Sequence, residues 1–268
     1  MYDVCIVITT RNEVKHIENC LKSVVAQDYP QDKIEIIVVD NNSTDKTKEI
    51  ALGFTSKVYN HGPERSAQRN LGISKAQAEY VLYLDADMSL SQNVIKECTE
   101  KCEREKLDAL YIPEKITGKG FWIKVRDFER SFYNATIIDC VRFLKKEKFL
   151  EIGGFDENLT GPEDWDFDRR IRAIGKAGVI NAPIYHNEDG FNLKTYIKKK
   201  IYYGASFEPY KDKWGPGDTL IKEQLGLRRC RLFFEHGKWL RLMRHPILTL
   251  AMLLLVFLKG ITYRSKER

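Results

Sequence analysis

Short apolar runs alternate with helical patterns through the first half of the chain, and this alternation is the strongest constraint on its fold. The runs are only a few residues long and rich in Val and Ile, which is typical of strands buried on both faces. Strands are predicted at Asp3–Thr9, Ile34–Asp40, Lys57–Tyr59, Tyr80–Leu84 and Asp108–Ile112. Helices are predicted between them at Glu13–Gln27, Asp45–Leu52, Arg65–Ala76 and Gln92–Lys106. This order indicates an α/β fold with a Rossmann-like, mainly parallel sheet flanked by helices.

Ser43 or Thr44 is expected to cap the helix at Asp45–Leu52, since either side chain can accept a hydrogen bond from a backbone N–H in the first turn of a helix.

The chain between about residues 108 and 190 is less regular but continues the same domain. Further elements are predicted as helices at Lys119–Thr136, Lys145–Glu151 and Glu163–Ile174 and a strand-like run at Val179–Ile184, which Pro183 interrupts. Residues 1–190 are therefore predicted to form one domain.

A basic extension follows at residues 191–268. Residues 1–190 carry 27 Lys and Arg against 32 Asp and Glu, whereas residues 191–268 carry 17 against 6. Basic tails bind nucleic acid or anionic lipid. Ile247–Leu258 is an apolar run of twelve residues, shorter than the roughly 20 that a spanning helix needs, and it favours lipid over nucleic acid. The run is predicted to lie at a membrane surface, to re-enter it, or to pack in a homo-oligomer.

The cysteines and the amino terminus favour a cytoplasmic setting. The six cysteines include no CxxC pair, and small buried thiols are the expected state rather than zinc ligands or disulfides. Met1 leads directly into a predicted strand, without a basic leader and an apolar signal stretch. We therefore expect a reducing environment, at the cytoplasmic face of the cell membrane.

Polar clusters follow three of the predicted strands. Asp85 and Asp87 come after the apolar run Tyr80–Leu84, Asp40 ends an earlier strand, and Thr9–Glu13 ends the first. Paired carboxylates beside a buried strand need neutralisation, and Mg²⁺ or Mn²⁺ provides it naturally. Ligands of open α/β sheets sit beyond the carboxyl ends of the strands, so a nucleotide site is expected there. An acidic turn with capping residues is the structural alternative.

Several longer segments resemble glycosyltransferase family 2, whose members have the GT-A fold. The matching segments run in the family's order over about residues 1–190. They are IVITTRNE, IEIIVVDNNSTDKT, GPERSAQRNLGISKAQAEYVLYLDAD, FLEIGGFDENLTGPEDWDFDRRIRAIG and the later Tyr185-His186. The resemblance implies a GT-A domain at residues 1–190 that binds a nucleotide sugar.

The resemblance implies roles at the nucleotide. Residues expected to hold the nucleotide are Thr10, Glu13, Asp40, Asn42, Arg69 and Asp85. Asp85 and Asp87 resemble the family's metal pair, with Mn²⁺ or Mg²⁺ bridging the diphosphate, and His186 is a candidate third ligand. Arg69 is expected to reach the diphosphate or the donor sugar, and Arg65 lies on the same helical face. A solvated basic face and a structural histidine are the alternatives for Arg65, Arg69 and His186.

The resemblance also implies the catalytic groups. Asp164 is expected to act as the base that takes the acceptor's proton, and Glu163 to orient hydroxyl groups. Trp165 is expected to stack on an acceptor sugar or to pack in the core. Without the resemblance, this acidic segment would be interpreted as a helix start that complements the helix dipole.

The function implied is inverting, metal-dependent transfer of a single hexose to a membrane-associated acceptor. The chain lacks the Q-x-x-R-W motif and the several spanning helices of processive members. GDP-mannose is favoured as donor on family analogy, with UDP-glucose or another UDP-sugar as the alternative. The acceptor is expected to be lipid-linked or a glycolipid. A nucleotidyltransferase, a nucleic-acid-binding protein and a non-catalytic nucleotide-sugar binder remain open, although the first usually has a Gly-rich basic loop where this chain has TTRNE.

Overall fold

A seven-stranded sheet is the centre of the fold. The structure is a computed structural model, and it describes residues 2–204, 207–215, 217–224 and 226–264. The strands lie in the order β3-β2-β1-β4-β8-β6-β9. Their bounds are β1 Val4–Thr10, β2 Ile34–Asp40, β3 Val58–Asn60, β4 Tyr80–Asp85, β6 Ala109–Tyr111, β8 Phe143–Lys145 and β9 Ala177–Val179. All pairs are parallel except those of β8, which runs antiparallel to β4 and β6.

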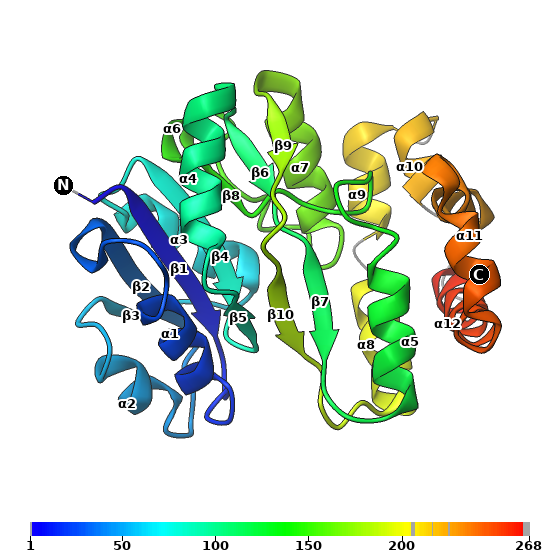
Figure 1. Cartoon of the computed structure of the whole chain (residues 1–268), viewed down its shortest axis with the longest axis horizontal. Helices are drawn as coiled ribbons and strands as arrows, with labels where there is room; N and C mark the ends of the chain where they lie inside the picture. Colours follow the sequence, from blue (N-terminus) through cyan, green and yellow to red (C-terminus); the bar gives the residue numbers. More distant parts are fainter. Residues whose placement is uncertain (1, 205–206, 216, 225, 265–268) are drawn as a thin grey trace.

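Helices cover both faces of this sheet (Figure 1). Successive residues of β1 point to opposite faces, so Ile6 packs on one side and Val7 on the other. The first face is covered by α1 (Ile17–Val25), α2 (Thr47–Leu52) and α4 (Val94–Glu105). The second is covered by α3 (Arg65–Lys75), α6 (Lys146–Glu151) and α7 (Glu163–Ile174). Burial on both faces explains why these strands are continuously apolar.

A second, three-stranded sheet extends the carboxyl edge of the first. In it, β10 (Ile184–Asn187) pairs antiparallel with β5 (Met88–Leu90) and parallel with β7 (Glu114–Thr117). Because β5 begins just after Asp87, this sheet brings residue 186 opposite the end of β4. The helix α5 (Phe121–Arg130) packs against β7.

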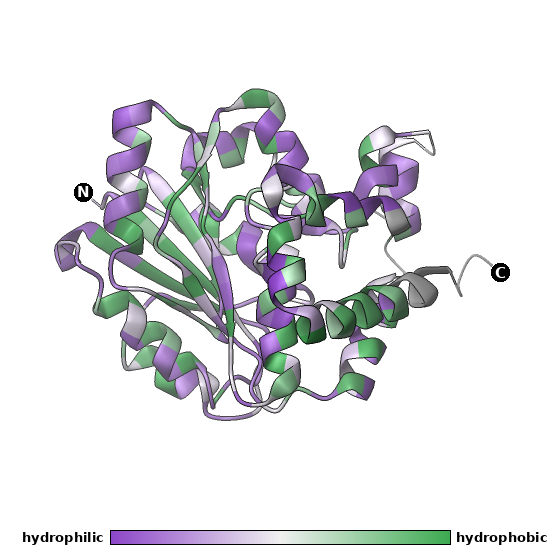
Figure 2. Ribbon diagram, turned by 45° about the vertical axis from the view of Figure 1, so that its right-hand side comes forward, coloured by the Kyte–Doolittle hydropathy of each residue, from purple (hydrophilic) through white to green (hydrophobic). Residues whose placement is uncertain are grey.

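The remaining helices form a separate C-terminal layer, residues 191–264. Its elements are α8 Leu193–Gly204, α9 Phe207–Trp214, α10 Thr219–Gln224, η2 Gly226–Phe233, η3 Glu235–Gly237, α11 Trp239–Arg244 and α12 Pro246–Arg264. The helix α12 packs against α5 and α8, and Figure 2 shows its ribbon as predominantly hydrophobic. Within the described residues no single helix meets the length and hydropathy that crossing a membrane requires. The pair Glu235–Arg244 and Pro246–Lys259 meets them jointly, with a bend of 116°.

Several predicted elements differ from the structure. The helix predicted at Lys119–Thr136 ends at Arg130, and the single run predicted at Val179–Ile184 instead joins the end of β9 to the start of β10. The strands β5, β7 and β8 were not predicted, because three or four residues are too few to show a period.

The predicted cap of α2 was wrong. Neither Ser43 nor Thr44 caps this helix; instead the backbone N–H of Thr47 donates to Asp45 at 3.0 Å. Ser43 is occupied by hydrogen bonds to Asp40. The six thiols are free, as predicted, and all but the half-buried Cys230 are buried.

Candidate active site

A cavity of about 750 Å³ opens at the carboxyl ends of β1 and β4. The parallel register places Thr9 beside Asp85 and Thr10 beside Asp40. Thr9 donates its hydroxyl to Asp85 across the two strands at 2.9 Å. The register of the parallel strands therefore places these side chains in the cavity wall, since parallel strands end at the same edge of the sheet.

Thr10 and Glu13, both predicted to contact the nucleotide, line the cavity. The Thr10 hydroxyl is buried and has no hydrogen-bond partner among the described residues, so it is available to a ligand. Burial, together with the neighbouring Asp87, raises the pKa of Glu13 to about 7. This edge of the cavity therefore carries concentrated negative charge.

Two arginines join this edge to the start of α7. Arg69 donates to Asp164 at 2.8 Å and to Asp85 at 3.1 Å, and it stacks on the ring of Tyr83. Arg65 donates to Glu163 at 2.9 Å. Although burial opposes ionisation, Arg69 and Arg65 hold the pKa of Asp85 below its usual range. Carboxylates from β4 and α7 are thus held close together by shared guanidinium groups.

The two arginines of α3 lie in different surroundings. Arg69 is fully buried and does not line the cavity, whereas Arg65 does. Both stand on one face of α3, as their spacing predicted, but Arg69 points into the packing between α3 and α7. Arg69 therefore holds Asp85 and Asp164 in place, and Arg65 is the arginine of this pair that faces the cavity.

Glu163 and Asp164, at the start of α7, differ in their exposure to the cavity. Asp164 lines the cavity and its side chain is 28% exposed, whereas the Glu163 side chain is 2% exposed and lies behind it. Burial and the neighbouring Asp164 raise the pKa of Glu163. Trp165 also lines the cavity, donating its indole N–H to the carbonyl of Ile138 at 3.1 Å. Of these three, Asp164 has the exposure that a catalytic base needs.

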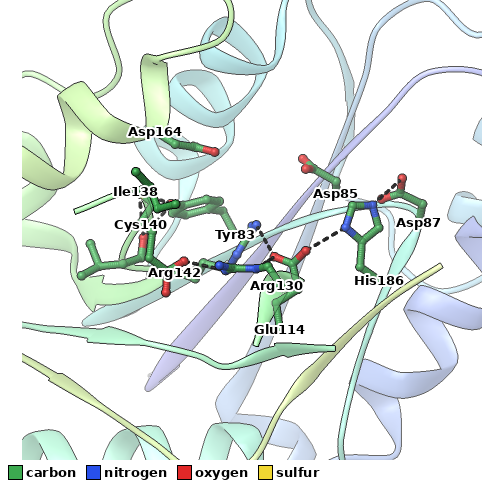
Figure 3. A network of polar contacts seen from close by, with 12 residues as sticks. Tyr83, Asp85, Asp87, Glu114, Arg130, Ile138, Cys140, Arg142, Asp164 and His186 are labelled. Atoms are coloured by element: carbon green, nitrogen blue, oxygen red, sulfur yellow. Dashed lines mark hydrogen bonds and ion pairs between the residues drawn. The ribbon is translucent and has the colours of Figure 1, made fainter. Parts of the chain in front are cut away.

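Asp87 and His186 meet at the opposite wall (Figure 3). The His186 ring lies between two carboxylates, with Nε2 3.3 Å from Asp87 and Nδ1 2.9 Å from Glu114. Burial opposes the charged imidazole, but these hydrogen bonds outweigh it and raise the pKa of His186 to about 10. Glu114 in turn bridges to Arg130 and Arg142, so the ring is fixed on both sides.

The three predicted metal ligands are only partly assembled. Figure 3 shows the Asp85 carboxylate turned toward Asp164, away from His186. Over the described ranges no three His, Cys, Asp or Glu side chains are grouped closely enough to hold a metal ion. The second oxygen of Asp87 is nevertheless buried without a partner in that part of the chain. The orphaned carboxylate oxygen suits a divalent cation, and the His186 ring can join it as a ligand once Nε2 has released its proton, so the residues present fit one.

Two predicted nucleotide contacts lie outside the cavity wall. Asp40 is buried, and its carboxylate accepts hydrogen bonds from the backbone and hydroxyl of Ser43. Asn42 is exposed on the same turn, with a φ of 50°. Asp40 therefore stabilises the turn after β2, a role that Asp favours because its side chain bonds the backbone a few residues on.

Much of the cavity wall was missed from the sequence. The additional charged residues include Glu114, Arg126, Glu129, Arg130, Arg142, Glu188, Lys200 and Lys259. One signal was present: Arg142 stands alone among apolar residues at positions 140–144, and a lone charge in a buried run needs a partner. Glu114 begins the short strand β7, and the remaining residues stand in helices or loops, so which way each side chain faces depends on tertiary packing.

Comparison with known families identifies the chain. The family described as "Glycosyl transferase family 2" matches residues 5–155. The chain belongs to glycosyl transferase family 2. Glycosyltransferase AglE of Haloferax volcanii is 38% identical over 189 residues, covering 64% of this chain and 62% of AglE. TarS of Staphylococcus aureus, a poly(ribitol-phosphate) β-N-acetylglucosaminyltransferase, is 29% identical over 125 residues, covering 43% of this chain and only 22% of TarS.

Solved structures confirm the fold of this family 2 chain. PcManGT, a mannosyltransferase from Pyrobaculum calidifontis solved with GDP-Man and Mn²⁺, superposes with a TM-score of 0.64 at 18% identity, covering 100% of this chain and 89% of that one. The crystal structure of TarS gives a TM-score of 0.61 at 19% identity, covering 98% of this chain and 54% of TarS. The GT-A fold predicted from the sequence is therefore confirmed.

Proposed function

We propose that this chain transfers a single hexose from a nucleotide sugar to a lipid-linked or glycolipid acceptor. The cavity carries the proposal, because it joins the ends of β1 and β4 to Asp164 and His186 in one space. A cavity of about 750 Å³ suits a nucleotide sugar with room for part of an acceptor. Its wall combines a carboxylate for proton transfer with acidic and basic groups for a diphosphate and its cation.

Asp164 is the proposed base. It lines the cavity, and its contact with Arg69 fixes its orientation at 2.8 Å. In the reaction, a hydroxyl oxygen of the acceptor attacks the anomeric carbon as its proton passes to Asp164, and the bond from that carbon to the diphosphate breaks. Attack from the opposite face inverts the anomeric centre. Arg65 lies on the same wall and stabilises negative charge on the departing nucleotide.

A divalent cation, Mn²⁺ or Mg²⁺, is the proposed cofactor. Asp87 and His186 would hold it, with Asp85 close by, and it would offset the charge of the leaving diphosphate. Support comes from the orphaned oxygen of Asp87 and from a structural neighbour solved with Mn²⁺.

GDP-mannose is the proposed donor, with a UDP-sugar as the alternative. The mannosyltransferase neighbour was solved with GDP-Man, and TarS was solved with UDP-GlcNAc. Both neighbours share the fold at below 20% identity, so their ligands support a nucleotide sugar without choosing the base.

The proposed place of action is the cytoplasmic face of the cell membrane. One face of α12 exposes Ile247, Leu250, Leu254 and Phe257, at 71%, 70%, 47% and 64%. Exposed apolar side chains at this spacing on a basic extension are typical of an interfacial helix. The alternative is that this face of α12 packs against a second copy of the chain.

A transfer assay tests the proposed function. The chain, with Mn²⁺, is incubated with GDP-mannose or UDP-glucose and a membrane lipid extract, and lipids are followed by mass spectrometry. The expected result is a gain of one hexose on a lipid with release of nucleoside diphosphate. Binding of the nucleotide sugar with neither transfer nor release would instead identify a non-catalytic binder.

A further inference from the structure

The cavity has a second end, away from the strand ends, where basic side chains gather. It lies between α5, α8 and the C-terminal helix α12, which pack against one another. We define the basic arm of the cavity by its lining residues Arg126, Tyr196, Lys200, Arg229 and Lys259. They come from four elements far apart in the sequence, so no local pattern reveals them.

Two of these cations already have carboxylate partners. Arg126 donates to Glu188 at 2.8 Å and to Glu129 at 3.1 Å, and Lys259 bonds to Glu129. Arg229 stacks over the ring of Tyr133 at 4.5 Å. These contacts fix this part of the cavity wall, because Glu129 and Glu188 are already paired with Arg126 and Lys259.

Lys200 and the Tyr196 hydroxyl are donors of the basic arm that have no acceptor among the described residues. Within the described ranges, Lys200 makes no ion pair, and its ammonium lies 5.4 Å from the ring centre of Tyr196. The Tyr196 hydroxyl is buried and likewise has no hydrogen-bond partner in those ranges. A buried hydroxyl beside a cation costs free energy unless an acceptor reaches both. An anion with several oxygens is the ligand that does so.

The electrostatics of Lys200 agree with that geometry. Burial and the neighbouring Arg126 and Lys259 lower the pKa of Lys200 to about 7. Like charges are therefore held together at this end of the cavity, whereas acidic groups gather at the strand ends. A bound anion would relieve the repulsion.

The helix α12 connects the basic arm to an apolar surface. Its inner face carries Met252, Leu255 and Lys259, spaced three and four residues apart and buried. Its outer face exposes Leu250 and Phe257. The same helix thus places the Lys259 ammonium in the cavity wall and exposes apolar side chains on its outer face. This arrangement suits a molecule with an anionic head and an apolar tail.

We propose that the basic arm binds the phosphate of a lipid phosphate, and that this phosphate anchors the acceptor. The proposal rests on the proposed function and names its acceptor class. A phosphate dianion or diester has no proton for Asp164 to accept, whereas a sugar hydroxyl has one. The phosphate therefore serves as a handle, and the attacking hydroxyl belongs to a sugar carried on it. Lys200 and the Tyr196 hydroxyl donate to the phosphate oxygens.

Binding of a soluble lipid phosphate tests the proposal without requiring transfer. Farnesyl phosphate, farnesol and inorganic phosphate are titrated calorimetrically into the full chain. Farnesyl phosphate is expected to bind at least tenfold more tightly than either of the others. Equal affinity for farnesol would overturn the phosphate site, and equal affinity for inorganic phosphate would overturn the assignment to a lipid.

Variants locate the site. Lys200→Met is expected to weaken farnesyl phosphate about tenfold, and Tyr196→Phe about threefold, because each loses one donor to a charged group. Lys198→Met is the matched control, since Lys198 is exposed on the same helix and does not line the cavity. Unchanged affinity in both Lys200→Met and Tyr196→Phe would overturn the proposal. Nucleoside diphosphate binding with Mn²⁺, measured on the same samples, reports separately on the proposed function and on folding.

Discussion

The strand-end half of the cavity and the C-terminal layer solve the same problem, a polar site inside a protein, in different ways. At the strand ends, Thr9, Thr10 and Asp85 are placed by the register of buried parallel strands. Where the C-terminal layer docks on the domain, Glu129 of α5 and Lys259 of α12 meet only because these two helices pack together. The first arrangement is as rigid as the sheet, whereas the second depends on the docking of helices. We therefore expect the donor site to withstand changes that loosen the acceptor side.

The largest expected effect is a loss of the transfer rate while the strand-end half of the cavity and the C-terminal layer both stay folded. Asp164→Asn retains an oxygen that can accept from Arg69 but removes the base, so kcat is expected to fall by about 10³-fold. The unfolding midpoint should fall only modestly, because the buried Arg69 keeps Asp85 as a charged partner. Steady-state transfer kinetics measure kcat, and a thermal melt measures the unfolding midpoint. Asp32→Asn, on an exposed turn, is the control. A wild-type kcat in Asp164→Asn would remove Asp164 from the role of base.

The next prediction compares the titration of two buried carboxylates. Burial raises the pKa of Asp168, under the main sheet, from 3.8 to about 7, although Tyr111 and Val141 donate hydrogen bonds to it. Glu129, in contrast, has a lowered pKa, because Lys259 and Arg126 outweigh its burial. Asp168 favours folding fully below pH 3.8, and that contribution disappears as the pH rises through about 7.

Asp168→Asn should therefore stabilise the fold at high pH and not at low pH. At roughly 1.4 kcal/mol per pKa unit, the gain in free energy of unfolding is about 4 kcal/mol at pH 8 and near zero at pH 4. Urea titrations of both proteins at the two pH values measure it. An equal difference at both pH values would contradict the raised pKa of Asp168.

The third prediction weakens only the C-terminal layer. Lys259→Met leaves Glu129 buried with one cation fewer, and the free energy of unfolding is expected to fall by roughly 3 kcal/mol. Lys22→Met removes an exposed pair with Glu18 and should change it by less than about 0.5 kcal/mol. Nucleoside diphosphate affinity should be unchanged in both. A parallel loss of nucleotide binding in Lys259→Met would show that the two halves are one unit.

The smallest expected effect concerns the outer face of α12. Leu250→Ser removes a side chain that is 70% exposed, and binding to anionic vesicles is expected to weaken about tenfold. Leu52→Ser, also exposed but on α2, is the control and should change nothing. Sedimentation with vesicles measures both. If dimerisation rather than vesicle binding is lost, the face is a contact between copies.

The same contrast explains what the sequence could predict. The apolar strands β1, β2 and β4 were predicted correctly, and the clusters after β1 and β4 do line one cavity, because strand periodicity and the carboxyl-edge rule need only local pattern; the cluster after β2 does not line it. The burial of Arg69 and the exposure of Arg65 to the cavity could not be predicted, since both share a face of α3 and only the packing of α7 decides which is covered. The basic arm was missed entirely, because its members come from helices whose packing leaves no local signature.

Every role proposed for the cavity requires that the strand ends hold a nucleoside diphosphate together with a divalent cation. The direct measurement is a thermal-shift screen of GDP and UDP, each with and without Mn²⁺, on the wild-type chain and on Asp87→Ala. The account predicts that one nucleotide raises the wild-type midpoint only when Mn²⁺ is present, and that Asp87→Ala abolishes this rise. A nucleotide shift that is the same without Mn²⁺, or that survives in Asp87→Ala, would contradict it.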